Sequence, residues 1–245
     1  MRPLRRIFHE NIENESVTLN QEESHHLLKV LRLSTGDKVE IFDGMGASRP
    51  ARVGETRKKS AEIVFAGPKE VQPAPEPLVT LAVAPPKGQR MDTLVQMAQE
   101  IGLDELVPII TDNSARNEFS DNKFARWKRV AIAAAKQSGN NRVIRFAQAM
   151  DFDALVADFG KWDLRIACHV GATGTNLRDC INATAKPSNV LACVGPEGGF
   201  TNMEITAARE AGFSVAGFPT ATLRVETAAV FALSALRALL GVNAL

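Results

Sequence analysis

Cysteine is scarce in this sequence of 245 residues, which holds only Cys168, Cys180 and Cys193. An odd number of cysteines without closely spaced pairs argues against a disulfide framework and against a structural zinc site. Two of the three lie in apolar, strand-like runs, where a thiol behaves as a small core residue. We therefore expect inert thiols in a reducing compartment, and no metal site.

Long hydrophobic runs and a strong charge of either sign are also missing. No stretch is long and apolar enough to span a bilayer, and Met1–Arg6 is not followed by the apolar segment of a signal peptide. The formal net charge is +1, so no overall field indicates nucleic acid, and only local basic patches can do so. We expect a soluble, cytoplasmic protein with no membrane partner.

Apolar residues make up 45% of the chain, which is typical of a globular protein with a real core. Residues 67–77 contain four prolines and read as a stiff linker between regions of different character. We predict an N-terminal domain at residues 1–70, a linker at residues 71–77 and a C-terminal domain at residues 78–245.

The N-terminal domain has the pattern of a small β-rich unit with one helix. The helix is predicted because His26, Leu27, Val30 and Leu31 are spaced for one helical face. The predicted elements are a helix at 22–33 and strands at 38–42, 50–53 and 61–65.

The C-terminal domain alternates strands with helices, which predicts a parallel sheet covered by helices on both faces. Continuous apolar runs such as Leu78–Ala84 indicate strands buried on both sides. The predicted strands are 78–84, 106–110, 164–168, 190–194 and 213–218, and the predicted helices are 90–101, 120–137, 153–157, 177–183 and 225–240. The last helix is apolar nearly all round, so we expect a symmetric dimer contact to cover part of it.

A glycine-rich turn, Gly195–Gly199, joins the apolar run Val190–Val194 to a helix start. Thr201 and Glu204 have the spacing of a capping box, which predicts where that helix begins. Strand, glycine-rich turn and helix in this order often form a ligand crevice in α/β proteins. A side chain at Gly198 is expected to clash with such a ligand or to strain the backbone. The alternative is a tight connector without a ligand.

The turn is neither Gly-x-Gly-x-x-Gly nor a phosphate loop ending in Gly-Lys-Ser/Thr. A dinucleotide-dependent oxidoreductase is therefore a weak alternative. Residues 116–145 are locally basic. This segment is either a solvated helix face or a surface that follows RNA phosphates, and the residues alone do not decide between them.

Two motifs, Gly195–Phe200 and Leu223–Ala228, resemble those of the ribosomal RNA small subunit methyltransferase E family. Ser24–Arg32, Lys87–Asp92 and Ala134–Ser138 agree with the same family, so the resemblance covers nearly the whole chain. It implies an α/β trefoil-knotted SPOUT methyltransferase domain, a parallel sheet with helices on both faces, preceded by a small PUA-like β-barrel. It also implies S-adenosyl-L-methionine as cofactor, methylation of uridine N3 in 16S ribosomal RNA of the small ribosomal subunit, and a homodimer.

The resemblance and the basic segments together nominate the functional residues. The cofactor residues are His169, Val194, Gly195, Pro196, Glu197, Gly198, Gly199, Phe218, Thr222, Leu223, Arg224 and Thr227. The RNA-binding residues are Arg5, Arg6, Lys29, Arg32, Lys87, Arg90, Arg116, Arg126 and Arg142. For catalysis, Arg224 is the candidate for stabilising charge on the uracil. Glu197 and Glu226 are both candidates for accepting the N3 proton.

Four positions depart from the family pattern: Met97, Asn140, Pro219 and Ala221. They are expected on cofactor and RNA surfaces. They leave open a second hypothesis, a knotted RNA-binding assembly factor that has lost catalysis.

Overall fold

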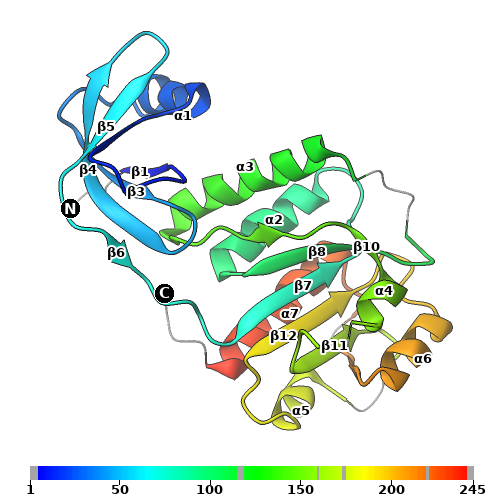
Figure 1. The fold of residues 1–245 in the computed structure, drawn as a ribbon. Helices are drawn as coiled ribbons and strands as arrows, with labels where there is room; N and C mark the ends of the chain where they lie inside the picture. Colours follow the sequence, from blue (N-terminus) through cyan, green and yellow to red (C-terminus); the bar gives the residue numbers. More distant parts are fainter. Residues whose placement is uncertain (1–4, 115–118, 159, 173–174, 219–220, 242–245) are drawn as a thin grey trace. The chain divides into compact units, whose positions relative to one another are not determined.

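The computed structural model describes residues 5–114, 119–158, 160–172, 175–218 and 221–241. The chain divides into two units (Figure 1). Unit 1 comprises Met1–Ala74 and Ile132–Val143, and unit 2 comprises Pro75–Ala131 and Ile144–Leu245. The first division falls inside the proline-rich stretch. Nothing in the hydrophobic pattern indicates that residues 132–143 belong to unit 1.

Unit 1 is built on a six-stranded sheet in the order β1-β3-β4-β5-β2, with β6 paired to β4. Its strands are β1 Arg5–Phe8, β2 Ser16–Thr18, β3 Lys38–Phe42, β4 Ala47–Thr56, β5 Ala61–Phe65 and β6 Glu70–Val71. The β1–β3 pairing is parallel and the others are antiparallel. Alternating side chains such as Val39, Ile41 and Ile63 form its core, which explains the alternating pattern in the sequence.

The predicted helix of unit 1 changes its winding part-way. Helix α1, Gln21–His25, continues as a π-helix, His26–Val30, in which the N–H of Leu31 donates to the carbonyl of His26 over 2.9 Å. The wider turn shifts the phase of the apolar face. Leu27 is buried but Val30 is 60% exposed, so these residues do not share the single helical face that their spacing predicts.

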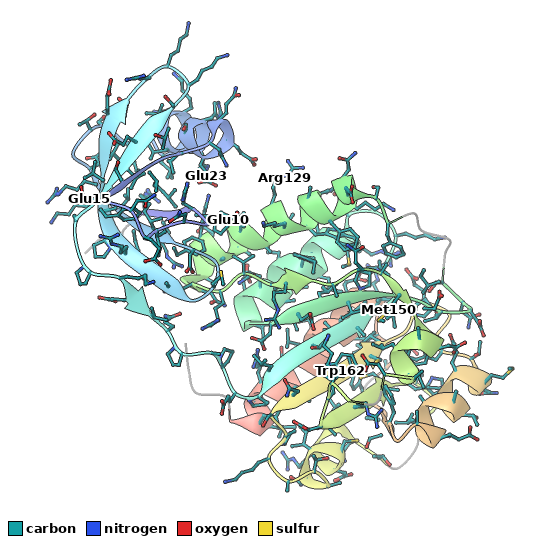
Figure 2. The ribbon with its side chains drawn as sticks, viewed as in Figure 1. Glu10, Glu15, Glu23, Arg129, Met150 and Trp162 are labelled. Atoms are coloured by element: carbon teal, nitrogen blue, oxygen red, sulfur yellow. The ribbon has the colours of Figure 1, made fainter. Side chains whose placement is uncertain are left out.

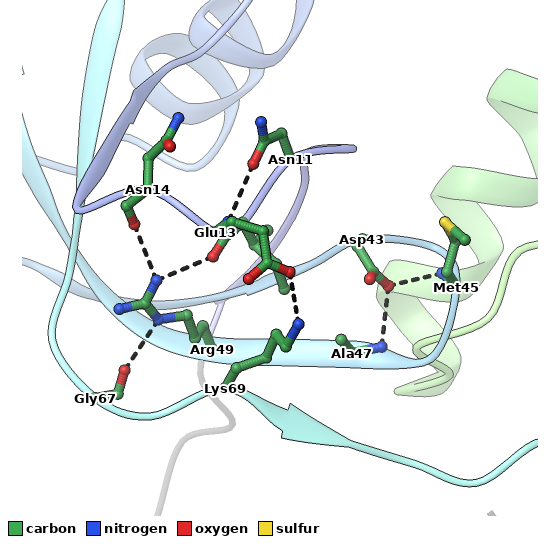
Figure 3. A network of polar contacts seen from close by, with 10 residues as sticks. Asn11, Glu13, Asn14, Asp43, Met45, Ala47, Arg49, Gly67 and Lys69 are labelled. Carbon is green, nitrogen blue, oxygen red and sulfur yellow. Dashed lines mark hydrogen bonds and ion pairs between the residues drawn. The ribbon is translucent and has the colours of Figure 1, made fainter.

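Polar side chains tie the loops of unit 1 to its sheet (Figure 3). The Arg49 guanidinium donates to the carbonyls of Ile12, Asn14 and Gly67 over 2.9–3.0 Å. Asp43 accepts from the N–H groups of the β3–β4 turn. The Arg49 contacts satisfy backbone carbonyl groups, and the Asp43 contacts satisfy backbone N–H groups.

Unit 2 contains a seven-stranded sheet in the order β10-β8-β7-β12-β11-β13, with β9 paired to β8, and every pairing is parallel. Its strands are β7 Leu78–Val83, β8 Glu105–Ile110, β9 Arg145–Phe146, β10 Met150–Asp151, β11 Leu164–Cys168, β12 Asn189–Val194 and β13 Ser214–Ala216. The parallel sheet is as predicted. Its central strands β7 and β12 are buried on both faces, which is why their sequences do not alternate.

Helices cover both faces of this sheet (Figure 1). They are α2 Arg90–Ile101, α3 Asp121–Ser138, α4 Phe152–Val156, α5 Leu177–Asn182, α6 Asn202–Glu210 and α7 Val225–Leu240. Helices α4 and α6 pack with Val107, Ala167 and Leu191 on one face. Helix α7 lies on β7 and β12 and also contacts α2 and α5.

One buried polar link fixes the amino-terminal part of the sheet of unit 2. The indole N–H of Trp162, labelled in Figure 2, donates to the Thr80 hydroxyl over 3.2 Å. Both residues are buried, so this bond satisfies groups that would otherwise be costly to bury. Among the described helices, none is long and apolar enough to cross a membrane.

Candidate active site

The residues that follow three neighbouring strands of unit 2 lie at the same edge of the sheet. β12, β11 and β13 lie side by side and are parallel, so their carboxyl ends share one edge of the sheet. Ligands of open α/β sheets bind outside such an edge. The glycine-rich turn follows β12, His169 follows β11, and the segment leading into α7 follows β13.

A pocket of about 280 Å³, here called the motif pocket, lies among these segments. It is lined by Cys168, His169, Val170, Val194, Gly195, Pro196, Gly199, Phe218, Ala221, Thr222, Leu223, Val225 and Ala228. Neither a carboxylate nor a lysine or arginine is among these described lining residues. Its wall is therefore made of apolar side chains, hydroxyl groups and backbone.

The two titratable residues in the pocket wall are held neutral. Burial lowers the pKa of His169, and the nearby Arg209 lowers it further. Burial raises the pKa of the Cys168 thiol to about 12. At neutral pH the described wall therefore carries no ionised side chain, which suits a ligand that must not meet a fixed positive charge.

The glycine-rich turn is held in a defined shape. The N–H of Gly199 donates to the Pro196 carbonyl over 2.8 Å, and Gly199 has φ +71°, a conformation that favours glycine. The predicted capping box is confirmed: Glu204 accepts from the N–H of Thr201 over 2.7 Å, and the Thr201 hydroxyl accepts from the N–H of Glu204 over 3.2 Å. Helix α6 therefore begins where the sequence predicts.

Gly198 plays a different part from the one predicted, because it does not line the pocket. The Asn113 carboxamide donates to the carbonyls of Gly199 over 3.0 Å and of Gly198 over 3.4 Å. A Cβ atom at Gly198 would lie 3.2 Å from the Cβ of Asn113. The missing side chain at Gly198 thus makes room for Asn113, and the expected clash of a Gly198 side chain with a ligand stays a prediction.

This clamp gives a testable expectation for Asn113→Ala. Losing a neutral hydrogen bond costs about 1 kcal/mol, so we expect the affinity for the ligand of the motif pocket to fall about three- to tenfold. Calorimetry with S-adenosylmethionine measures this, with the exposed Asn202→Ala on α6 as the matched control. Equal affinities of both variants and the parent would show that Asn113 does not hold the turn in its binding shape.

Arg90 connects three segments beside the motif pocket. From the first position of α2, its Nη2 donates to Glu197 Oε1 over 2.7 Å, and its Nη1 lies 3.9 Å from Glu226 Oε2. Its Nε donates to the Lys87 carbonyl over 3.2 Å. Arg90 is predicted as an RNA contact, and its guanidinium lies between the two candidate proton acceptors.

The three predicted catalytic side chains have different surroundings. The Glu197 side chain is 47% exposed and bonded to Arg90, whereas that of Glu226 is 10% exposed. Glu226 Oε2 is buried and accepts no hydrogen bond from the described residues. Arg224 is exposed at the N-cap of α7 and makes no side-chain capping bond.

Most predicted cofactor residues line the motif pocket, but not all. Glu197, Gly198, Arg224 and Thr227 are outside its lining. The lining residues that the sequence reasoning missed are Cys168, Val170, Ala221, Val225 and Ala228. Val225 and Ala228 are three residues apart on α7 and so share a helical face, which Thr227 does not. Helical spacing could therefore have identified them.

Two predicted RNA-binding arginines are engaged inside unit 1. Arg6, whose side chain is 9% exposed, pairs with Glu40 over 2.7 Å and donates to Asn141 and to the carbonyls of Ala135 and Asn140. Arg142 donates to the Gln72 carbonyl over 2.8 Å. We leave both out of the RNA surface, because both side chains are engaged by residues of unit 1.

The other predicted RNA contacts are placed differently. Arg5, Lys29, Arg32 and Lys87 are exposed. Arg126 is half-exposed and pairs with Asp92. Arg116 lies outside the described residues. Of the departures, Ala221 lines the motif pocket, but Asn140 is buried in unit 1, so it is not on a surface as expected.

Comparisons with known proteins agree with this geometry. An RNA methyltransferase domain model matches residues 73–237, and an RNA methyltransferase PUA domain model matches residues 19–66. The ribosomal RNA small subunit methyltransferase E of Synechocystis is 31% identical over 232 residues, covering 94% of this chain and 76% of that protein. The chain belongs to the ribosomal RNA small subunit methyltransferase E family. The resemblance seen in the sequence is thus confirmed.

Solved structures of similar proteins cover nearly the whole chain. A Legionella pneumophila methyltransferase in complex with S-adenosylmethionine has a TM-score of 0.86 at 28% identity, covering 96% of this chain and 98% of that chain. A Neisseria gonorrhoeae ribosomal RNA small subunit methyltransferase E bound to S-adenosylmethionine also has a TM-score of 0.86, at 27% identity, covering 97% and 98%. The predicted α/β methyltransferase domain with a PUA domain is therefore confirmed.

Proposed function

We propose that this protein uses S-adenosylmethionine to methylate N3 of a uridine in 16S ribosomal RNA of the small subunit. The observation that carries the proposal is the motif pocket: the two family motifs, separated by residues 201–222, both line one cavity whose described wall has no ionised side chain. Similar proteins of this family bind the same cofactor.

The motif pocket fits this cofactor by its chemistry. Its volume is near the lower end of the range of about 300–1,000 Å³ for ligand pockets. The neutral His169 and the absence of lysine and arginine from the described wall leave a sulfonium cation unrepelled. When bound, S-adenosylmethionine supplies an electrophilic methyl group.

The residues beside the motif pocket can perform the remaining chemistry. Uracil N3 carries a proton that must leave before or as the nitrogen attacks, and the ring becomes anionic. We assign Glu226 as the proton acceptor, because its buried Oε2 has no hydrogen bond among the described residues. Glu197 is exposed and occupied by Arg90. Arg224, exposed beside the pocket, stabilises the charge that develops on a uracil oxygen.

The decisive experiment for the function is mass mapping of methylated uridines in 16S RNA. Small subunits from cells that lack the gene are incubated with the purified protein and S-adenosylmethionine. One new methyl group on N3 of a uridine is expected. Cofactor binding without any methylation would count against the enzyme. Failure to bind the cofactor in calorimetry would favour the inactive assembly factor. That alternative is motivated by Ala221, a departure from the family pattern that lies in the pocket wall.

We also propose that the protein is a homodimer, with the C-terminal chain threaded as a trefoil knot. Apolar residues of α7 remain partly exposed in one stripe at helical spacing: Ala228, Phe231, Ala235 and Leu239. Phe231 is 37% exposed and Leu239 38% exposed. Packing against the same stripe of a second copy buries these apolar side chains. A crystal structure tracing the chain from β11 through α7 tests both the knot and the contact.

The dimer proposal predicts that Phe231→Asp produces a monomer. A charge in an apolar contact is costly to bury, so light scattering at micromolar concentration should give the mass of one chain. Because the Phe231 ring packs edge-on against Phe218 of the motif pocket at 4.9 Å, cofactor affinity should also fall. Met203→Asp, at a site 81% exposed on α6, serves as the control and should remain dimeric. If Phe231→Asp still has the mass of a dimer, the dimer contact lies elsewhere on the protein.

A further inference from the structure

A second pocket of unit 2, here called the basic pocket, shares no lining residue with the motif pocket. It has a volume of about 120 Å³ and lies where β7 leads into α2, facing the first part of α3. It is lined by Pro85, Pro86, Lys87, Gly88, Met91, Asp92, Phe119, Lys123, Arg126 and Trp127.

The charges around the basic pocket favour an anionic ligand. Among the described lining residues, Lys87, Lys123 and Arg126 contribute three positive charges and Asp92 contributes one carboxylate. Arg126 Nε donates to Asp92 Oδ2 over 2.9 Å, yet the Arg126 side chain is 52% exposed and remains open to a second partner. Lys87 and Lys123 are both exposed. A concave site with excess positive charge attracts anions.

The apolar side of the basic pocket is rigid. Pro85 and Pro86 restrict the backbone of the loop. The Trp127 ring is 5% exposed and packs edge-on against Phe124 at 5.2 Å and beside Phe146 at 6.2 Å. A preformed wall loses little entropy when a ligand binds.

The size of the basic pocket limits its ligand. Its volume of about 120 Å³ is less than half that of the motif pocket, about 280 Å³. One phosphate group fits in this space, whereas a cofactor of nucleoside size does not.

The first turn of α2 joins the basic pocket to the catalytic residues. Arg90 contacts Glu197 and Glu226, while the next two residues, Met91 and Asp92, line the basic pocket. Successive residues of a helix rise about 1.5 Å. A phosphate of an RNA strand can therefore lie in the basic pocket while a base of the same strand occupies the catalytic site.

We propose that the basic pocket binds a backbone phosphate of the substrate RNA close to the methylated uridine, held by Lys87, Lys123 and Arg126. This inference rests on the proposed function, because it takes the substrate to be RNA. The phosphate fixes the register of the strand, so that one uridine and not its neighbours is presented for reaction.

The test removes the charge of the basic pocket without altering its shape. The double variant Lys87→Gln/Lys123→Gln is compared with Arg178→Gln/Lys186→Gln, which removes the same charge from exposed residues of unit 2 that line neither pocket. Binding of a single-stranded oligouridylate is measured across salt concentrations, and methylation kinetics are measured on small subunits lacking the modification.

The basic-pocket variant should raise the KM for small subunits about tenfold or more. The slope of log affinity against log salt should fall by about one, as for the loss of one phosphate contact. Affinity for S-adenosylmethionine should stay unchanged. Asp92→Asn removes the opposing carboxylate and should tighten binding of the oligouridylate.

Equal effects of the two double variants would overturn the proposal, because then only net charge matters. Weaker oligouridylate binding by Asp92→Asn would also overturn it. Failure of the proposed function is seen separately, as an absence of methylation or cofactor binding by the unmodified protein.

Discussion

Replacing Arg224 with alanine should lower the rate of methyl transfer by about a hundredfold or more, the usual cost of removing one donor that stabilises a developing anion. Charge appears on the uracil only as N3 loses its proton and attacks. An arginine that meets this charge therefore stabilises the transition state more than the bound substrate, and kcat should fall more than KM rises. The structure leaves the side chain exposed and without a capping bond at the start of α7, so its loss removes no hydrogen bond or ion pair among the described residues.

Three comparisons separate this role from a structural one. Arg224→Ala should remain folded and dimeric and keep most of its cofactor affinity, because Arg224 does not line the motif pocket. Arg224→Lys should recover only part of the rate, since a point charge lacks the planar fork of the guanidinium. The exposed Arg178→Ala should match the parent rate. A near-parent rate for Arg224→Ala would make Arg224 a bystander, and a loss of folding would make it structural.

The sheet of unit 2 could be predicted because its signal is long and uniform. Continuous apolar runs at β7 and β12 require burial on both faces, which a parallel sheet between helices provides. Strands β9 and β10 have two residues each and cannot show a period. The π-helix at His26–Val30 could not be predicted for a related reason. The extra residue in its turn leaves the composition unchanged but alters which side chains are buried.

The candidate site could be predicted in part. The glycine-rich turn and its capping box depend on residues close together in sequence, so local patterns identify them. The hydrogen bond from Arg90 to Glu197 joins residues 107 positions apart in the sequence, and the hydrogen bond from Asn113 to Gly199 joins residues almost as far apart in the sequence. Only the order of strands brings these residues together. For the same reason, a basic residue such as Arg6 could not be recognised from the sequence as a buried partner of Glu40.

Replacing Glu226 with glutamine should lower kcat by about 10²–10⁴-fold, the usual contribution of a positioned general base. Glutamine preserves the shape of the side chain but cannot accept the N3 proton as a carboxylate does. Glu226 is a better candidate than Glu197, because its Oε2 is buried without a hydrogen bond among the described residues and lies 3.9 Å from Arg90. Single-turnover rates on small subunits, with cofactor affinity from calorimetry, measure the effect.

Glu197→Gln is the matched control, because it makes the same chemical change on the other side of Arg90. It removes the charge from an exposed hydrogen bond to Arg90, so its kcat should fall much less than that of Glu226→Gln. Raising the pH should restore part of the rate of Glu226→Gln, since hydroxide then removes the uracil proton without help from the protein. A larger loss in Glu197→Gln would reverse the assignment. Equal and small losses would mean that neither carboxylate takes the proton and that water accepts it directly.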